Sequence, residues 1–129
     1  WMEKVIERTK ELGYVETVFG RRRYMPGIYE KNRTLYDLAR RVAINTVAQG
    51  TAAELMKRGM ISLADSFKKE GLSASLLLQI HDELLIEVPQ PELEKTEALV
   101  KEKLESVVSW PIPLVVTTRT GKDWQEVTK

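Results

Sequence analysis

The stretch LLLQIHDELLIEV, from Leu76 to Val88, places His81, Asp82 and Glu83 between two apolar runs. Two short apolar runs that flank a polar break are typical of a β-hairpin. The three polar residues then either form a turn, in which aspartate supplies local hydrogen bonds, or form a charged site. Both interpretations are open on this stretch alone.

The composition is that of a globular protein. The chain has 129 residues, of which 43% are hydrophobic and 30% are charged, enough for one domain with a core. It contains no apolar run of membrane-spanning length, no signal-peptide pattern and no cysteine, which excludes disulfides and zinc–thiolate sites. We therefore expect a cytoplasmic protein without a membrane partner. Because the chain begins at Trp1, we also expect it to be part of something longer.

Charge is distributed unevenly along the chain. Residues 1–59 hold 12 Lys and Arg against 7 Asp and Glu, a balance of +5, and residues 60–129 hold 8 against 12, a balance of −4. A basic half can face a polyanion while an acidic half is solvated or holds metal. A chance fluctuation of composition is the alternative.

Hydrophobic periodicity and turn residues predict the order of elements. In chain order we expect a helix over Met2–Leu12, a hairpin within Tyr14–Met25, helical structure from Thr34 to about Lys69, strands at Ala74–Ile80 and Leu84–Val88, a helix from Pro91 to about Val108, a strand at Leu114–Thr118 and a polar tail over Gly121–Lys129.

Two details of this pattern concern the long helical region. Gln49-Gly50-Thr51 interrupts it, which favours two helices with a bend, and Thr34 with Asp37 resembles a capping box. The apolar strands predict a sheet covered on both faces. The fold class is α+β: a small antiparallel sheet, made of the hairpin carrying His81-Asp82-Glu83 and a C-terminal strand, is backed by helices in a single domain over residues 1–129.

Arg41, Asn45 and Gln49 follow one another at a spacing of four residues, so they form one stripe along a helix. Three long hydrogen-bond donors on a rigid helix suit the minor groove of a duplex, which presents acceptors at every base pair whatever the sequence. A polar solvent-facing stripe is the alternative.

Arg21, Arg22 and Arg23 lie in the predicted N-terminal hairpin among Tyr14, Phe19 and Tyr24. Arginines on an extended segment can neutralise phosphates, and aromatic rings can stack on bases. A solubilising loop with aromatic anchors is the alternative.

Adjacent carboxylates at a hairpin tip can hold a hard divalent cation such as Mg²⁺, which prefers oxygen ligands and substrate phosphates. Asp82 and Glu83 are the candidates, and a plain turn is the alternative. A nucleophilic triad is not credible, because His81 is the only histidine and no serine lies in a strained elbow.

Three segments in order resemble the C-terminal palm region of the family A DNA polymerases, the bacterial DNA polymerase I group. They are GYVETVFGRRRYMP (Gly13–Pro26), RRVAINTVAQGTAAELMK (Arg40–Lys57) and LLLQIHDELLIEVP (Leu76–Pro89), and the ending GKDW (Gly121–Trp124) is also similar. The resemblance covers nearly the whole chain. It implies a fragment of a DNA-directed DNA polymerase of replication and repair.

The resemblance implies a role for each matched residue. QIHDE is similar to the family's motif C, so Asp82 would be the catalytic carboxylate that binds Mg²⁺ and Glu83 its supporting neighbour. Gln79 and His81 would lie by the primer terminus. Arg41, Asn45 and Gln49 would contact the primer–template, and the segment Arg21–Arg23 would lie near the nucleic acid or brace the palm.

Two features of the family have no match in this sequence. Its second metal-binding aspartate and its nucleotide-gripping helix lie upstream in the family, and Asp37 and Asp65 lack the surrounding motif. A two-metal site needs more than one carboxylate pair. We therefore expect in-line attack of the primer 3′-hydroxyl on a dNTP only in the full enzyme, and no polymerisation by this chain without the missing upstream portion.

Two rival interpretations remain. The first is a catalytically silent module that binds duplex nucleic acid, with an affinity that does not depend on Asp82. The second is a structural fragment whose exposed sheet edge promotes self-association.

Overall fold

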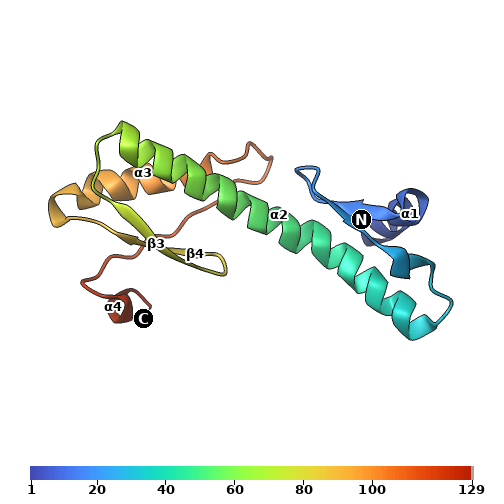
Figure 1. Ribbon diagram of the computed structural model, residues 1–129. Coiled ribbons are helices and arrows are strands. Elements are labelled where there is room, and N and C mark those ends of the chain that lie inside the picture. The colour runs from blue at the N-terminus through green and yellow to red at the C-terminus, as the bar shows by residue number, and fades with distance from the viewer. Residues whose placement is uncertain (129) are drawn as a thin grey trace. The chain divides into compact units, whose positions relative to one another are not determined.

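In the computed structural model, which describes residues 1–128, the chain divides into two compact units, Trp1–Glu54 and Leu55–Lys129. The elements are α1 (Met2–Leu12), β1 (Tyr14–Glu16), β2 (Arg22–Tyr24), η1 (Pro26–Tyr29), α2 (Arg33–Lys69), β3 (Ser75–Ile80), β4 (Glu83–Glu87), η2 (Gln90–Glu92), α3 (Leu93–Glu105) and α4 (Trp124–Val127), shown in Figure 1. Two antiparallel two-stranded sheets, β1–β2 and β3–β4, confirm the α+β class.

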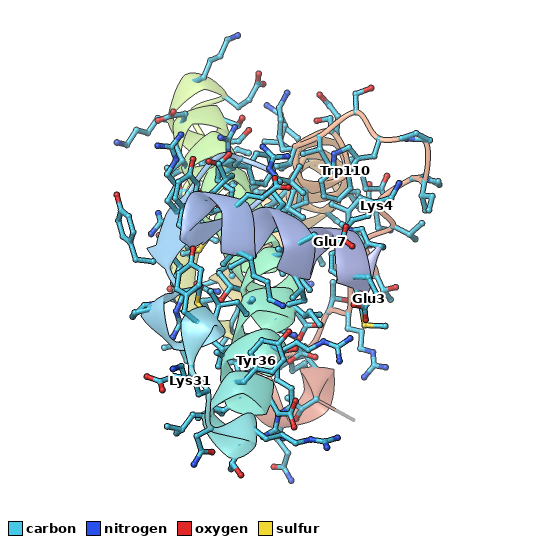
Figure 2. The ribbon with its side chains drawn as sticks, turned by 90° about the vertical axis from the view of Figure 1, so that its right-hand side faces the viewer. Glu3, Lys4, Glu7, Lys31, Tyr36 and Trp110 are labelled. Atoms are coloured by element: carbon cyan, nitrogen blue, oxygen red, sulfur yellow. The ribbon has the colours of Figure 1, made fainter. Side chains whose placement is uncertain are left out.

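Helix α1 has the predicted bounds. Gly13, with φ of 77°, forms its left-handed cap and donates its backbone N–H to the Thr9 carbonyl. Ile6 and Thr9 lie on the buried face, while Glu3, Lys4 and Glu7 are exposed on the same helix (Figure 2). This alternation of faces is why the local pattern identified the helix.

The core of the first unit lies between α1, the β1–β2 hairpin and the first part of α2. Its buried members are Ile6, Val15, Met25, Ile28, Ala39 and Ala43. The alanines of α2 let the hairpin and η1 approach the helix closely, since their side chains are short. Gly27 packs in the same way, because a Cβ there would lie 3.2 Å from Cβ of Ala39.

Helix α2 is one continuous helix of 37 residues, and the expected bend at Gln49–Thr51 was wrong. Gly50 has helical neighbours on both sides and packs against Thr17, a contact that the local sequence does not reveal. The predicted capping box was also wrong. The side-chain oxygen of Asn32 caps the helix by accepting from the backbone N–H groups of Thr34 and Leu35, at 2.9 and 3.3 Å.

The β3–β4 hairpin confirms the two strands predicted in the second unit. Its register pairs Leu76 with Ile86 and Leu78 with Leu85, so that Leu77 is the extra residue of a β-bulge. The core of this unit contains Leu63, Phe67, Ala74 and Val100, with Leu76, Leu84 and Ile86 packed against it.

The expectation of a sheet covered on both faces was wrong for residues 1–128. Leu77 is 52% exposed and Leu78 47% exposed, because only one face of this hairpin packs on the core formed by α2 and α3. A two-stranded hairpin with one apolar face open is stabilised through its other face alone.

The expected strand at Leu114–Thr118 is not formed. The prolines at 111 and 113 carry no backbone donor, and the segment is tied to α3 through side chains. The backbone N–H of Val116 donates to a carboxylate oxygen of Glu105 at 2.9 Å, and the Thr118 hydroxyl donates to Glu97. These bonds take the place of a strand ladder.

The remaining boundaries differ in smaller ways. Gln90–Glu92 forms a 3₁₀ turn before α3, which ends at Glu105 rather than near Val108. The expected polar tail contains the short helix α4, where the Asp123 side chain accepts from the Glu126 N–H. Lys129, the last residue of the predicted tail, lies outside the described residues.

Candidate metal and nucleic-acid site

His81 and Asp82 are the two residues of the tight turn between β3 and β4, and Ile80 pairs with Glu83 on either side of it. His81 has φ of 53°, in the left-handed region. Two-residue hairpin turns that match the twist of their strands need a positive φ at the first central residue. A histidine accepts this conformation at a cost of about 1 kcal/mol.

Gln79 lies in β3 beside this turn. Its side-chain amide donates to the backbone carbonyl of His81 at 3.1 Å. The bond joins two residues of the predicted site and holds the first half of the turn. Within residues 1–128, the side-chain amide of Gln79 is therefore bonded to the backbone of the hairpin turn.

The side chains of Asp82 and Glu83 are exposed at the tip. Neither carboxylate has a hydrogen bond or ion pair with another group in residues 1–128, and no group of three or more His, Cys, Asp or Glu side chains gathers in that range. Two exposed carboxylates at a hairpin tip fit the oxygen preference of Mg²⁺. They supply only part of a shell, so waters, phosphates or further carboxylates must complete it.

Arg41, Asn45 and Gln49 lie on one exposed face of α2, as their spacing predicted. Their side chains make no hydrogen bond or ion pair with other groups of residues 1–128. Ala48 and Ala52 flank Gln49 on this face and are also exposed. We call Arg41, Asn45 and Gln49 the donor stripe. Its short neighbours leave room for a ligand to approach the donors.

Each of the three hairpin arginines contacts a partner in the first unit. Arg21 pairs with Glu54 at 3.3 Å, and Arg22 pairs with Glu16 at 2.8 Å. Arg23 donates to the hydroxyl of Thr46 at 3.3 Å. Each arginine therefore has a contact inside the first unit, and both roles expected of this segment stay predictions.

Arg22 is also held by an aromatic ring. Its guanidinium lies 4.6 Å from the ring centroid of Tyr14, which packs edge-on against Tyr24. The hydrogen bond with Glu16, followed by the charge of Tyr14, raises the pKa of Arg22. The aromatic residues of the hairpin thus anchor it from within.

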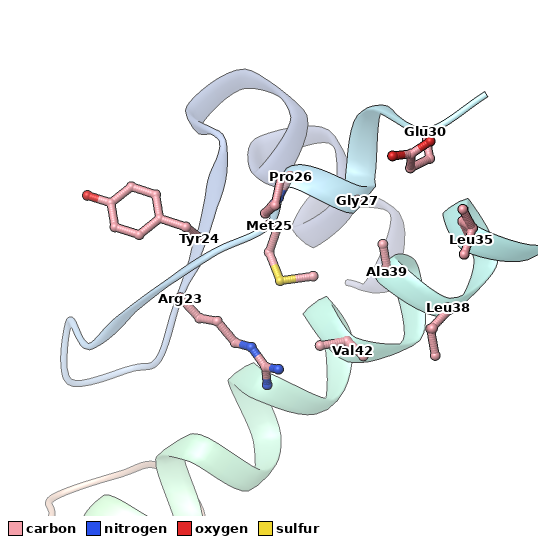
Figure 3. Close-up of a pocket in the computed structure, with 10 residues that line it drawn as sticks. All are labelled: Arg23, Tyr24, Met25, Pro26, Gly27, Glu30, Leu35, Leu38, Ala39 and Val42. Atoms are coloured by element: carbon pink, nitrogen blue, oxygen red, sulfur yellow. The ribbon is translucent and has the colours of Figure 1, made fainter. Parts of the chain in front are cut away.

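A shallow hollow of about 330 Å³ lies between β2, η1 and the first turns of α2 (Figure 3). Met25, Ala39 and Val42 form its apolar floor, and Arg23 borders it. Leu35 and Leu38 on its wall are exposed. The sequence did not indicate this hollow, since its lining comes from three separate segments.

Sequence reasoning missed Thr17, Thr46, Thr51 and Glu54, which hold the arginine hairpin on α2. The one available signal was Gly50 inside a helical pattern, because a glycine there costs helix stability and can allow another segment to pack closely. The donor stripe belongs to the first unit and the turn at His81–Asp82 to the second. Each group of predicted residues is thus assembled within its own unit.

The family model for DNA polymerase family A matches residues 1–126. A thermostable DNA polymerase I from Thermus filiformis is 46% identical over 126 residues, which cover 98% of this chain and 15% of the relative. DNA polymerase I from Bacillus caldotenax is 42% identical over 126 residues, which cover 98% of this chain and 14% of the relative. The chain thus spans about one seventh of the length of these curated relatives.

A solved structure is similar over the same extent. The POL domain of Pol1 from M. smegmatis, in complex with DNA primer-template and dNTP, matches with a TM-score of 0.96 at 37% identity, over 99% of this chain and 23% of that chain. In residues 1–128, no helix combines the length and apolarity that crossing a bilayer requires. Since the family model covers nearly the entire chain, the chain belongs to DNA polymerase family A.

Proposed function

We propose that this chain is the motif C-bearing palm part of a DNA-directed DNA polymerase, which transfers nucleotides from dNTPs to a primer 3′-hydroxyl. The observation that carries the proposal is the pair Asp82, in a tight turn, and Glu83, at the start of β4, both exposed and with no partner in residues 1–128, in a chain of family A. Carboxylates free of internal partners are available to a cation and to substrate.

Asp82 is the metal-binding carboxylate in this proposal, and Glu83 supports it. A bound Mg²⁺ supplies charge stabilisation to the reacting phosphate. Asp82 is held by the turn that His81 and Gln79 shape, and the rigidity of a two-residue turn limits the positions that its carboxylate can take. Gln79 and His81 lie by the primer terminus.

The donor stripe of α2 contacts the primer–template duplex. Arg41, Asn45 and Gln49 present donors that reach minor-groove acceptors at any base pair, so they test duplex geometry rather than sequence. Arg21, Arg22 and Arg23 add positive charge beside the nucleic acid or brace the fold. The protein works in the cytoplasm, in replication and repair.

The chain acts as one partial domain over residues 1–129 and polymerises only together with the upstream portion of its polymerase. Two carboxylates do not complete a two-metal site. The test is primer extension on a recessed template with Mg²⁺ and dNTPs, using the chain alone and the chain mixed with that upstream portion. We expect extension only in the mixture, and Asp82→Ala abolishes it. Extension by the chain alone refutes the requirement.

A second candidate function is a silent module that binds duplex without catalysis. The unpartnered donor stripe favours it, because the stripe needs no metal to bind a duplex. It predicts salt-dependent duplex affinity in the mixture with no extension. In that case Asp82→Ala leaves the affinity unchanged, whereas Gln49→Ala lowers it.

The exposed apolar edge of the β3–β4 hairpin also predicts self-association of the chain alone. Leu77 and Leu78 are about half exposed on a sheet of two strands, and open apolar edges pair with other chains. Light scattering over a range of concentrations tests this, with Leu78→Lys as the variant that restores a monomer. A monomer of the parent chain at high concentration contradicts it.

A further inference from the structure

The turn of the β1–β2 hairpin is fastened to α2 directly after the donor stripe. The buried hydroxyl of Thr17 donates to Glu54 at 2.5 Å and accepts from the backbone N–H of Arg21 at 3.2 Å. The buried hydroxyl of Thr51 accepts from the backbone N–H of Val18 at 3.2 Å. These bonds fix both the position of the turn along the helix and its orientation relative to the helix.

Gly50 makes this close approach possible. A Cβ built at Gly50 lies 2.7 Å from the Cγ2 methyl of Thr17, closer than real Cβ atoms come. Glycine inside a helix costs roughly 0.5–1 kcal/mol relative to alanine. The close packing of Thr17 explains why a glycine occupies this position despite that cost. We call Thr17, Gly50, Thr51 and Glu54 the hairpin joint.

The three arginines carried by this hairpin differ in how their charges are compensated. Arg21 and Arg22 face the carboxylates of Glu54 and Glu16. Arg23 donates to the neutral hydroxyl of Thr46 and forms no ion pair with a carboxylate of residues 1–128. Its side chain is exposed and extends from β2 toward α2 (Figure 3). Of the three arginines, Arg23 is therefore the one whose positive charge is not compensated by a carboxylate of residues 1–128 and is available to a phosphate.

Arg23 lies at the border of the donor stripe. Thr46 follows Asn45 in α2 and is about 60° around the helix from Gln49. Arg23 pairs with Val15 in the hairpin register, so the position of the hairpin on α2 sets the position of its guanidinium. That position is held at one end by the hairpin joint.

We propose that the hairpin joint is a positioning element, which holds Arg23 beside Asn45 and Gln49 so that its charge binds a backbone phosphate of the duplex. The joint residues do not touch the duplex in this proposal; they act through Arg23. The inference rests on the proposed binding of primer–template DNA. Arg21 and Arg22, whose charges are compensated, brace the hairpin and contribute little to phosphate binding.

The test measures affinity of the 129-residue chain for a short duplex with a recessed end, by fluorescence anisotropy over a range of salt concentrations. Arg23→Ala should weaken binding about fivefold and lower the salt slope by about 1, the share of one phosphate contact. Gly50→Ala should produce a similar change, because the added methyl group pushes the hairpin away from α2.

Two double variants separate positioning from general damage. Thr17→Ser removes the methyl group in the path of the new Cβ and keeps the hydroxyl, so Gly50→Ala with Thr17→Ser should recover the affinity of the parent chain. In an Arg23→Ala background, Gly50→Ala should have no further effect, because its action passes through Arg23. Equal weakening by Gly50→Ala in both backgrounds overturns the proposal.

Gly59→Ala is the matched control within α2. A Cβ there lies 2.6 Å from a Leu104 methyl group in the second unit, so the same substitution disturbs the same helix away from the joint. Any effect of Gly59→Ala on affinity should be the same with and without Arg23. If Gly50→Ala does not fold, Thr51→Val serves instead: it keeps the shape of the side chain but removes the acceptor of the Val18 N–H, and its effect should again require Arg23.

The outcomes distinguish failure of the proposed duplex binding from failure of the proposed positioning by the hairpin joint. A parent chain that does not bind duplex refutes the proposed function and this inference with it. A parent chain that binds, together with Gly50→Ala at unchanged affinity and salt slope, refutes the inference alone. Loss of binding in Gly50→Ala without recovery by Thr17→Ser also refutes it.

Discussion

The two hairpins of this chain carry opposite charges, and they differ in whether their polar side chains have partners within the chain. The β1–β2 hairpin is bonded to α2 through Thr17, Thr51 and Glu54. The tip of the β3–β4 hairpin carries Asp82 and Glu83, whose carboxylates have no partner in residues 1–128. The basic hairpin is thus bonded to the rest of its own unit, whereas the carboxylates of the acidic tip have no such internal bonds within that range.

This difference predicts that substitutions in the two hairpins change different quantities. A side chain with internal partners contributes to the stability of the fold, since removing it leaves other groups unsatisfied. A side chain without them can be replaced at little cost in stability, and its loss appears in binding or turnover.

Asp82→Asn should have the largest effect. In the mixture with the upstream polymerase portion, we expect a loss of turnover on the order of 10³-fold, because the amide removes the charge at the cation-binding position. The temperature of unfolding should change little, since the Asp82 carboxylate has no partner in residues 1–128. Single-turnover primer extension and thermal unfolding measure the two quantities.

Glu83→Gln is the comparison for this prediction. Because Glu83 is proposed to support Asp82, the loss of turnover in Glu83→Gln should be smaller than that in Asp82→Asn. Equal losses for the two variants would contradict the assignment of the principal carboxylate to Asp82. A large loss of stability in either variant would show that the carboxylates have structural partners.

Thr17→Val should destabilise the basic hairpin by about 1–3 kcal/mol. The shape of the side chain is kept, but the Glu54 carboxylate and the backbone N–H of Arg21 both lose a partner. Amide hydrogen exchange at Arg21 measures the local effect, and chemical denaturation measures the free energy of unfolding. Gln79→Leu, which removes one exposed bond to the His81 carbonyl, should cost less than half as much.

The same contrast explains which parts of the fold the sequence predicts. Helix α1 and both hairpins depend on neighbouring residues: alternating faces, Gly13 after the helix and a polar pair between apolar runs. The donor stripe follows from spacing along one helix. These features were predicted because the cause and the effect lie within one turn or one hairpin.

The errors concern contacts between distant residues. Gly50 indicates a bend when it is considered alone, but the helix continues through it, and Thr17, 33 residues earlier, occupies the space that a side chain at this position would fill. The strand expected at Leu114–Thr118 has the right composition, yet carboxylates of α3 bond the segment instead. The position of Asp82 in the turn of its hairpin was predicted from the sequence. That this carboxylate binds a metal ion stays a prediction.

His81→Gly should stabilise the acidic hairpin by up to about 1 kcal/mol. Glycine adopts the left-handed φ of 53° found at His81 without steric cost, and its greater freedom in the unfolded chain offsets part of the gain. Hydrogen exchange at the β4 amides measures it. Under the proposed function the same substitution should also lower turnover, because it removes the imidazole that is proposed to lie by the primer terminus. A stabilised and fully active variant would argue against a role of the His81 side chain.

Thr118→Val should have the smallest effect, visible as a change in the pH dependence of stability. The Thr118 hydroxyl bond, followed by Lys101, lowers the pKa of Glu97 from its usual 4.5. A carboxylate with a lowered pKa in the folded state stabilises the fold above its usual pKa, and this contribution is lost as pH falls through the lower folded value.

The parent chain should therefore lose stability below pH 4.5 more steeply than Thr118→Val, whose Glu97 lacks the stronger of the two causes. At neutral pH the variant should be slightly less stable, and the two melting temperatures should converge in acid. Thermal unfolding at a series of pH values measures this. Parallel curves throughout would mean that the Thr118 hydroxyl does not shift the pKa of Glu97, and that the segment at Thr118 is held to α3 by packing rather than by this carboxylate.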